Sequence, residues 1–370
     1  MLNDNIKNLL YPIVVNIEYI EDTGVYYGLS GATIFLFALD ENIERDIVYS
    51  LACEKTFHII EHFNVGLKSY STGCVGEARA LFYLNKKEFV DIKYDHQIFD
   101  MVDREIYSLN TSVTLDTESC GITAYVMDRF LAAPFTEFFQ LMRNERIIAH
   151  VDCIDNFLNS IELPWEIVRD IFELSAKRDS LENEVHNITN AAYILQGSND
   201  CKVYPEVTRN CQSRLTIRLK NLLQQVKKIS GSAYIIAELL PELQLYIYEL
   251  INISLSSTEF EEHDIQDYLD IANQMSKEIA NKRITRSVVH TFQMINILHI
   301  ILPKLSEPVF SKAIIPGIQQ VLETLTSEVN NLYLDYKYKG KLNIGLTGIS
   351  GIGLHLISKD DEWKKLLLKI

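Results

Sequence analysis

The feature that most constrains the fold is a Gly-x-x-Gly pattern that recurs immediately before apolar runs. Three clear copies occupy residues 28–31, 73–76 and 348–351. A short pattern that repeats ahead of one kind of segment is typical of repeat architectures, in which each unit buries its apolar face against its neighbours. The sequence therefore favours stacked, similar units over one irregular core.

Weaker copies, in which other residues replace one or both glycines, lie between the clear ones at residues 120–124, 187–190, 230–233 and 285–287. Successive copies are roughly 40–66 residues apart, which leaves room for a short inner helix, a longer outer helix and their turns. We expect inner helices to begin near residues 28, 73, 121, 187, 231, 285 and 348. An open helical array and an irregular bundle are the alternatives to a closed ring of hairpins.

The apolar spacing supports an all-α fold. Residues 41–64 and 207–229 each place apolar side chains along one stripe at helical spacing. The chain contains no Asn-Gly or Asp-Gly dipeptide, the strongest signal of a β-hairpin. We predict an α/α toroid of about seven helical hairpins forming one domain over 1–370, with the repeats spanning about 24–358.

The paired glycines are expected to act structurally. Without β-carbons at two positions of a helix start, neighbouring inner helices can approach closely. The six positions predicted to act in this way are Gly28, Gly31, Gly73, Gly76, Gly348 and Gly351.

Charge and cysteine usage narrow the partners and the location. The chain carries 35 Lys and Arg against 50 Asp and Glu, a net charge of −15, and no basic stripe offsets it. Binding to a phosphate backbone is therefore not expected. The six cysteines are scattered without a CxxC pair, so a disulfide framework is not expected either. With no signal peptide or membrane span predicted, we expect a cytoplasmic protein.

Three segments carry a family resemblance. Residues 345–353, GLTGISGIG, resemble the final inner-helix motif of the LanC-like lanthionine cyclases. Residues 27–31 and 72–76 resemble the first and second motifs of that family. The resemblance implies a seven-hairpin α/α toroid that forms thioether rings in ribosomally made peptides, with a precursor peptide and a dehydratase as partners.

In that family a zinc ion held by two cysteines and one histidine activates the substrate thiol. The ligands come from a Trp-Cys-x-Gly motif and a Cys-His-Gly motif. Here residues 184–190 and 226–231 stand at those places and contain neither cysteine. The family's aspartate before the second repeat is missing from 66–72, and its third-repeat histidine is replaced by Cys120. We therefore expect no zinc and no other cofactor.

The remaining candidates are side chains near the predicted helix starts. Cys74 and Cys120 lie where a helix N-terminus can stabilise a thiolate, although a small buried residue that fills a tight space is the simpler explanation. His186 is either a surviving ligand or a cap or surface residue at a helix start. Tyrosines just before the inner helices, Tyr26 and Tyr70 among them, are expected to line a peptide groove.

Two further groups of residues are weighed in the same way. His150 and Cys153 share one helix face, but two ligands are too few for a structural zinc. Cys201 and Cys211 bracket what reads as a polar loop and receive no role.

Three functions follow. The first is a LanC-like protein that binds or scaffolds a ribosomal peptide without zinc-dependent cyclisation. The second is an active enzyme in the same cavity, with Cys120 as base or nucleophile. The third is an unrelated α/α-barrel enzyme, such as a carbohydrate-active one. That class requires paired carboxylates, and Glu77 is the clearest acid at an inner-helix start.

Overall fold

Every regular element in the described part of the chain is a helix, so the protein is all-α, as the periodicity predicted. The computed structural model describes residues 4–43, 46–92, 97–108, 112–132, 137–160, 171–230, 240–256, 260, 262–284, 286–305, 314–333, 343–358 and 362–368.

The helices fall in this order along the chain: α1 (Asp4–Asn16), the 3-10 helix η1 (Ile17–Tyr19), α2 (Leu29–Ile43), α3 (Asp46–Glu61), α4 (Cys74–Lys86), α5 (Gln97–Ser108), α6 (Thr117–Ala132), α7 (Glu137–Asn159), α8 (Ile171–Asp200), α9 (Pro205–Ser230), α10 (Leu240–Leu255), α11 (Glu262–Lys282), α12 (Val288–Leu305), α13 (Ile314–Tyr333), α14 (Ile349–Ile357) and the 3-10 helix η4 (Glu362–Leu367).

The chain divides into two compact units. The first comprises Met1–His150, Gln196–Tyr204 and Asn330–Lys369, and the second comprises Val151–Leu195 and Pro205–Val329 with Ile370. The divisions fall inside α7, α8 and α13, so three helices belong partly to each unit. The single domain over 1–370 therefore stays a prediction.

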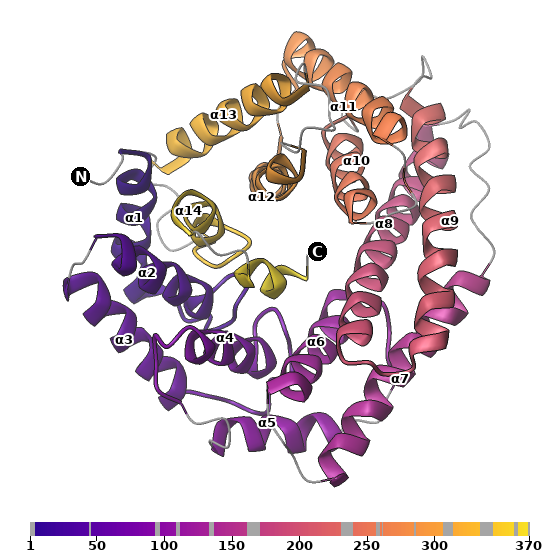
Figure 1. Ribbon diagram of the computed structural model, residues 1–370. Helices are drawn as coiled ribbons and strands as arrows, with labels where there is room; N and C mark the ends of the chain where they lie inside the picture. The colour runs from indigo at the N-terminus through magenta and orange to yellow at the C-terminus, as the bar shows by residue number, and fades with distance from the viewer. Residues whose placement is uncertain are drawn as a thin grey trace. The chain divides into compact units, whose positions relative to one another are not determined.

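The first unit is built on a row of buried helices. Helix α14 packs on α2, α2 packs on α4, and α4 packs on α6, although α14 comes from the far end of the chain (Figure 1). Helix α3 packs against α2, α5 against α4, and α1 against α14. Residues 74–84 of α4 are buried all round, which is what a helix enclosed by neighbours requires.

The second unit has α10 at its centre. Residues 240–254 are buried without a break, and α10 contacts α9, α11 and α12. Helix α12 is long and apolar enough to cross a membrane by length and composition, which the sequence analysis did not single out. Because 56% of that helix is buried, the feature is weak support for a membrane span.

The predicted helix starts have mixed outcomes. Helices begin at Leu29, Cys74 and Ile349, as expected for the three clear copies, and at Thr117 and Val288 near two of the weaker ones. The start predicted near residue 187 is wrong, because α8 runs through that position from Ile171. Asn and Thr lower helix propensity by only tenths of a kcal/mol, and no glycine or proline interrupts the helix there. Residues 231 and 285 lie outside the described residues.

The two predicted apolar stripes also need correction. Residues 41–64 span the end of α2 and all of α3, and on α3 the side chains of Ile47 and Phe57 are 83% and 65% exposed. The second stripe is confirmed in α9, where Leu215, Leu219 and Leu222 are buried, but Ile217 is 57% exposed. Helical spacing alone does not say how much of the stripe a neighbouring helix covers.

The polar loop predicted between Cys201 and Cys211 is wrong. Helix α8 continues to Asp200 and α9 begins at Pro205, so only a short turn separates them. Both cysteine side chains are buried. The polar residues of this segment lie on helix surfaces, where exposed side chains do not oppose helix formation.

Candidate functional site

The loops that precede α14, α2 and α4 bind one another through their backbones. The amide of Leu346 donates to the carbonyl of Val25 at 3.1 Å, and the amide of Thr347 donates to the carbonyl of Tyr26 at 3.1 Å. The amide of Tyr26 in turn donates to the carbonyl of Ser71 at 3.1 Å. The loops before α14, α2 and α4 therefore form a continuous stack, which we call the loop edge (residues 22–28, 66–73 and 343–348).

The sixth helix joins this stack through one carboxylate. Glu118, in the first turn of α6, accepts hydrogen bonds from the amides of Tyr70 and Ser71 and from the hydroxyls of Ser69 and Ser71. A carboxylate that accepts this many bonds next to a helix N-terminus is held firmly and is electrostatically stabilised. Glu118 thus fixes the position of the loop before α4.

The first and last loops have the same local structure. Asp22 Oδ1 accepts the amide of Gly24 at 2.7 Å, and Asn343 Oδ1 accepts the amide of Gly345 at 3.0 Å. These are Asx turns, in which a short polar side chain replaces a backbone partner. Residues 22–31 and 343–351 are therefore structural copies of one unit.

The serines of the two motifs repeat the same bond. Ser30 Oγ donates to the carbonyl of Thr23, and Ser350 Oγ donates to the carbonyl of Ile344, both at 2.5 Å. The serine within each of these two patterns thus ties the helix start to its own loop. This local reason for the residue was missed by the sequence analysis.

The glycines serve the loops more than the helix contacts that were expected. A β-carbon on Gly28, Gly73 or Gly348 would overlap a carbonyl of the glycine's own preceding loop. A β-carbon on Gly31 would meet Leu346 N at 2.5 Å and one on Gly76 would overlap the carbonyl of Tyr70. The pattern is therefore a requirement for close loop packing at each helix start.

Tyr26 and Tyr70 are buried beneath the loop edge and do not line an open groove. Their rings meet edge to face at 5.5 Å. The Tyr70 hydroxyl donates to the carbonyl of Leu366 at 2.6 Å and accepts from Arg79 Nη1 at 2.8 Å. The accessible aromatic side chain at this edge is instead Tyr27, which is 48% exposed.

Cys74 is the first residue of α4, as predicted, but the helix terminus does not make it acidic. Its thiol is buried, and burial, followed by the charges of Glu77 and Glu105, raises its pKa to about 12. The thiol is therefore protonated at neutral pH, which favours the interpretation of Cys74 as a small residue filling a tight space.

Cys120 has a neighbour that the sequence did not reveal. Its Sγ lies 3.3 Å from Nε2 of His150, which reaches it from α7. The other ring nitrogen of His150 lies 2.7 Å from Thr123 Oγ1, and Arg146 Nε donates to the same hydroxyl at 3.2 Å. Burial and the nearby Arg146 lower the pKa of His150 to about 4, so its ring is neutral at pH 7.

The hydrogen bonds of His150 decide what it can do for the thiol. Nε2 lies 2.9 Å from the carbonyl of Thr114, which can only accept, so the neutral ring carries its proton on Nε2. That nitrogen has no lone pair left to take a proton from Cys120. Both side chains are also fully buried. The pair therefore holds α7 against α6 and is not arranged as a nucleophile with its base.

The positions that correspond to the family's zinc ligands show no such arrangement. His186 lies in the middle of α8, half-buried, and not at a helix start as was expected. His150 and Cys153 lie three residues apart on α7, as predicted, and the His150 ring contacts Cys120. Among the described residues, no three His, Cys, Asp or Glu side chains come close enough together to hold a metal ion.

The loop edge gathers acidic side chains from separate elements. Glu77, in the first turn of α4, is 4% exposed, and one of its oxygens accepts the hydroxyl of Thr23. Burial, with a smaller contribution from Asp22, raises the pKa of Glu77 to about 7. Burial also raises the pKa of Asp22. The hydroxyl of Tyr27 lies in the same surroundings. Its pKa is raised by burial and by the charges of Glu118 and Asp22.

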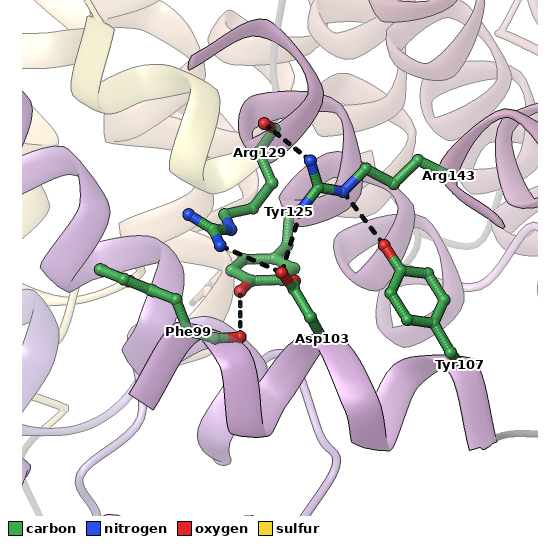
Figure 2. A network of polar contacts seen from close by, with 6 residues as sticks. All are labelled: Phe99, Asp103, Tyr107, Tyr125, Arg129 and Arg143. Atoms are coloured by element: carbon green, nitrogen blue, oxygen red, sulfur yellow. Dashed lines mark hydrogen bonds and ion pairs between the residues drawn. The ribbon is translucent and has the colours of Figure 1, made fainter. Parts of the chain in front are cut away.

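A second buried polar network supports α6 away from the loop edge. Figure 2 shows Arg129 and Arg143 converging on Asp103, with both guanidinium nitrogens 3.0 Å from the carboxylate. Arg143 also donates to the Tyr107 hydroxyl at 3.1 Å and to the carbonyl of Arg129 at 3.2 Å. The network joins α5, α6 and α7. Its carboxylate and guanidinium groups bind one another, so we assign it a structural role.

Comparison with known proteins adds no relative. No protein-family model matches the chain, and no curated protein or solved structure matches it either. The resemblance to the LanC-like family therefore rests on the motifs at residues 27–31, 72–76 and 345–353.

The sequence analysis missed most residues of the loop edge. It named Glu77 but not Asp22 or Thr23, and it gave no role to Glu118. One local signal was present, since Asp22-x-Gly24 and Asn343-x-Gly345 are the same turn in the two clearest copies. The meeting of Asp22 with Glu77 had no such signal, because it depends on how two loops stack.

Proposed function

We propose that this chain is a LanC-like protein that binds a ribosomally made peptide at the loop edge and does not cyclise it through zinc. The observation that carries the proposal is the hydrogen-bonded stack of three loops at the starts of α14, α2 and α4. The proposed fold is an α/α toroid of about seven hairpins, with the loop edge on one rim. The proposed partners are the precursor peptide and a dehydratase, in the cytoplasm.

Binding is favoured over catalysis by the state of the thiols. Cys74 is buried and protonated, and Cys120 faces a histidine nitrogen that already carries a proton. An enzyme that uses one of its own cysteines as a base or nucleophile requires a thiolate there and a group that accepts the thiol proton. Neither cysteine meets this requirement, so the second hypothesis has no support from the site geometry.

One feature of the site favours the third hypothesis, an unrelated α/α-barrel enzyme, and another counts against it. Asp22 and Glu77 are paired acids, and a pKa of about 7 is suited to a general acid. However, one Glu77 oxygen is engaged by Thr23 and the other is shielded from solvent, so neither is positioned to protonate a sugar. Peptide binding remains the better explanation of an edge with accessible Tyr27 and Asp22.

The test has a chemical arm and a binding arm. The purified protein is analysed for zinc and incubated with a synthetic peptide that contains dehydroalanine and cysteine, and thioether formation is followed by mass spectrometry. We expect less than stoichiometric zinc and no ring formation. Stoichiometric zinc together with cyclisation would refute the proposed loss of activity.

For the binding arm, a display library of random linear peptides is selected on the protein, and the enriched peptides are measured by fluorescence anisotropy. Tyr27→Ala should weaken their binding. Tyr19→Ala is the matched control, because Tyr19 is 61% exposed and lies in η1, outside the residues of the loop edge. If no peptide is enriched, or if the two substitutions have equal effects, the proposed site is wrong.

A further inference from the structure

Two carboxylates from different elements lie near each other at the loop edge, because Glu77 accepts the hydroxyl of Thr23, the residue that follows Asp22. Asp22 comes from the loop before α2, and Glu77 comes from the first turn of α4. The charge of Asp22 contributes to the raised pKa of Glu77, and within the described part of the chain neither carboxylate forms an ion pair. Like charges held together in this way are costly unless a cation or a proton compensates them.

Glu77 is the unusual member of the pair. Its Oε1 accepts the Thr23 hydroxyl, but its Oε2 is buried and has no hydrogen-bond partner in the described part of the chain. A buried carboxylate oxygen without a donor forgoes a charge-assisted hydrogen bond. Asp22, by contrast, is only partly buried, so an incoming group can reach it.

Other charged groups around the pair do not neutralise it. Glu118 adds negative charge from α6 but is held by the loop before α4. Lys68 belongs to the same surroundings, because it lowers the pKa of Cys74, but it is paired with Glu105 at 2.7 Å. Among these described groups, Glu118 is negative and the Lys68–Glu105 pair is neutral, so none of them compensates the two acids.

We propose that Asp22, Glu77 and the half-exposed ring of Tyr27 form a binding site for a cationic group of the peptide, a primary ammonium or a guanidinium. Asp22 and Tyr27 provide the accessible contacts, through an ion pair and a cation–π interaction. Glu77 lies behind them and supplies a second negative charge. The site rests on the proposed peptide function and specifies which peptides are bound.

The site makes binding depend on pH. A cation next to the pair favours the ionised form of Glu77, whose pKa in the free protein is about 7. Binding of the cation therefore releases a proton when the free protein holds one. The affinity should rise as the pH increases from about 6 to about 8 and then level off.

The first experiment uses small probes that do not depend on any peptide. Agmatine and n-butylammonium are titrated into the protein at about pH 6 and about pH 8, with n-butanol as the neutral control, and binding is followed by NMR. Asp22→Asn should weaken binding about tenfold, the equivalent of a charge-assisted hydrogen bond, and Glu77→Gln should weaken binding less, because it removes a negative charge that does not contact the cation. Glu77→Gln should also remove the pH dependence.

Glu61→Gln is the matched control, because it makes the same change in net charge on an exposed position of α3. If an acid variant fails to fold, Tyr27→Leu tests the site instead, because it removes the aromatic ring and should weaken binding of the cationic probes. Equal effects of Glu61→Gln and Glu77→Gln, or equal binding of n-butanol, would overturn the cation site.

The second experiment separates this inference from the proposed function. In peptides enriched from the library, each lysine is replaced by norleucine and each arginine by citrulline. The cation site is supported if these replacements weaken binding and if Asp22→Asn does not weaken the binding of the replaced peptides further. Peptides that bind regardless of these replacements would overturn it while the peptide function stands. Agmatine binding without any enriched peptide would support the site and refute the peptide function.

Discussion

Replacing Glu77 by glutamine should change the stability of the protein in a pH-dependent way. The carboxyl ionises near pH 7 in the folded protein and near 4.5 in an exposed chain. Because the folded state holds the proton over this interval, the folded protein loses stability as the pH rises from about 4.5 to about 7. The difference corresponds to about 3 kcal/mol, at 1.36 kcal/mol for each pH unit.

Thermal unfolding followed by circular dichroism at about pH 5 and about pH 8.5 measures this effect. At the lower pH both proteins hold a largely neutral group at position 77, so their melting temperatures should be similar. At the higher pH the variant should be more stable by up to about 3 kcal/mol, which amounts to several degrees at the 2–4 °C per kcal/mol of mid-sized domains. The glutamine oxygen can still accept the Thr23 hydroxyl.

The comparison of the two pH values removes costs that the substitution causes at any pH. An amide group left without a partner, for example, destabilises the variant equally at both. Glu61→Gln, on the exposed face of α3, should show no such change with pH. A difference between wild type and Glu77→Gln that stays constant from pH 5 to pH 8.5 would refute the burial of an ionisable carboxylate at this position.

Three further predictions concern packing, a buried ion pair and a buried histidine. Gly121→Val should destabilise by about 1–3 kcal/mol or more, because a β-carbon there would overlap an aromatic ring, whereas Gly317→Ala should be neutral or stabilising, since its nearest contact is a side-chain atom at 3.3 Å; melting temperatures compare the two. Asp103→Asn should cost about 3–5 kcal/mol in urea unfolding by depriving two buried guanidinium groups of their carboxylate, against at most about 1 kcal/mol for the exposed pair lost in Asp267→Asn. In the wild type, the free energy of unfolding should decrease as the pH falls from about 6.5 to about 4, because the buried His150 ring takes up its proton at a lower pH than the exposed ring of the unfolded chain. His150→Gln should remove this decrease. The stability of both proteins, measured across this pH range, checks the prediction.

The sequence predicted the parts of the fold that depend on local pattern. The three clear Gly-x-x-Gly copies marked the starts of α2, α4 and α14, because glycines and a following apolar run are local requirements of a buried helix start. The weak copy near residue 187 failed for the same local reason. Without a glycine, nothing in Asn187 to Asn190 is strong enough to end a helix.

The site was predicted only in outline. Cys74 and Cys120 were placed correctly near helix starts. However, the pKa of Cys74 is set by burial, and Cys120 contacts His150, which comes from another helix. The expected groove tyrosines, Tyr26 and Tyr70, are buried, since the stacking of the loops covers them.

The sequence by itself determined that the chain is helical, that it contains repeated helix starts, and that glycines are needed where those starts are crowded. These properties depend on residues close together in the chain. Tertiary structure alone decided that the loop before α14 lies on the loop before α2, and that Asp22 meets Glu77. The reason is physical: the pKa of a carboxylate and the partner of a backbone amide depend on whatever lies beside them in space, and those neighbours come from distant parts of the chain.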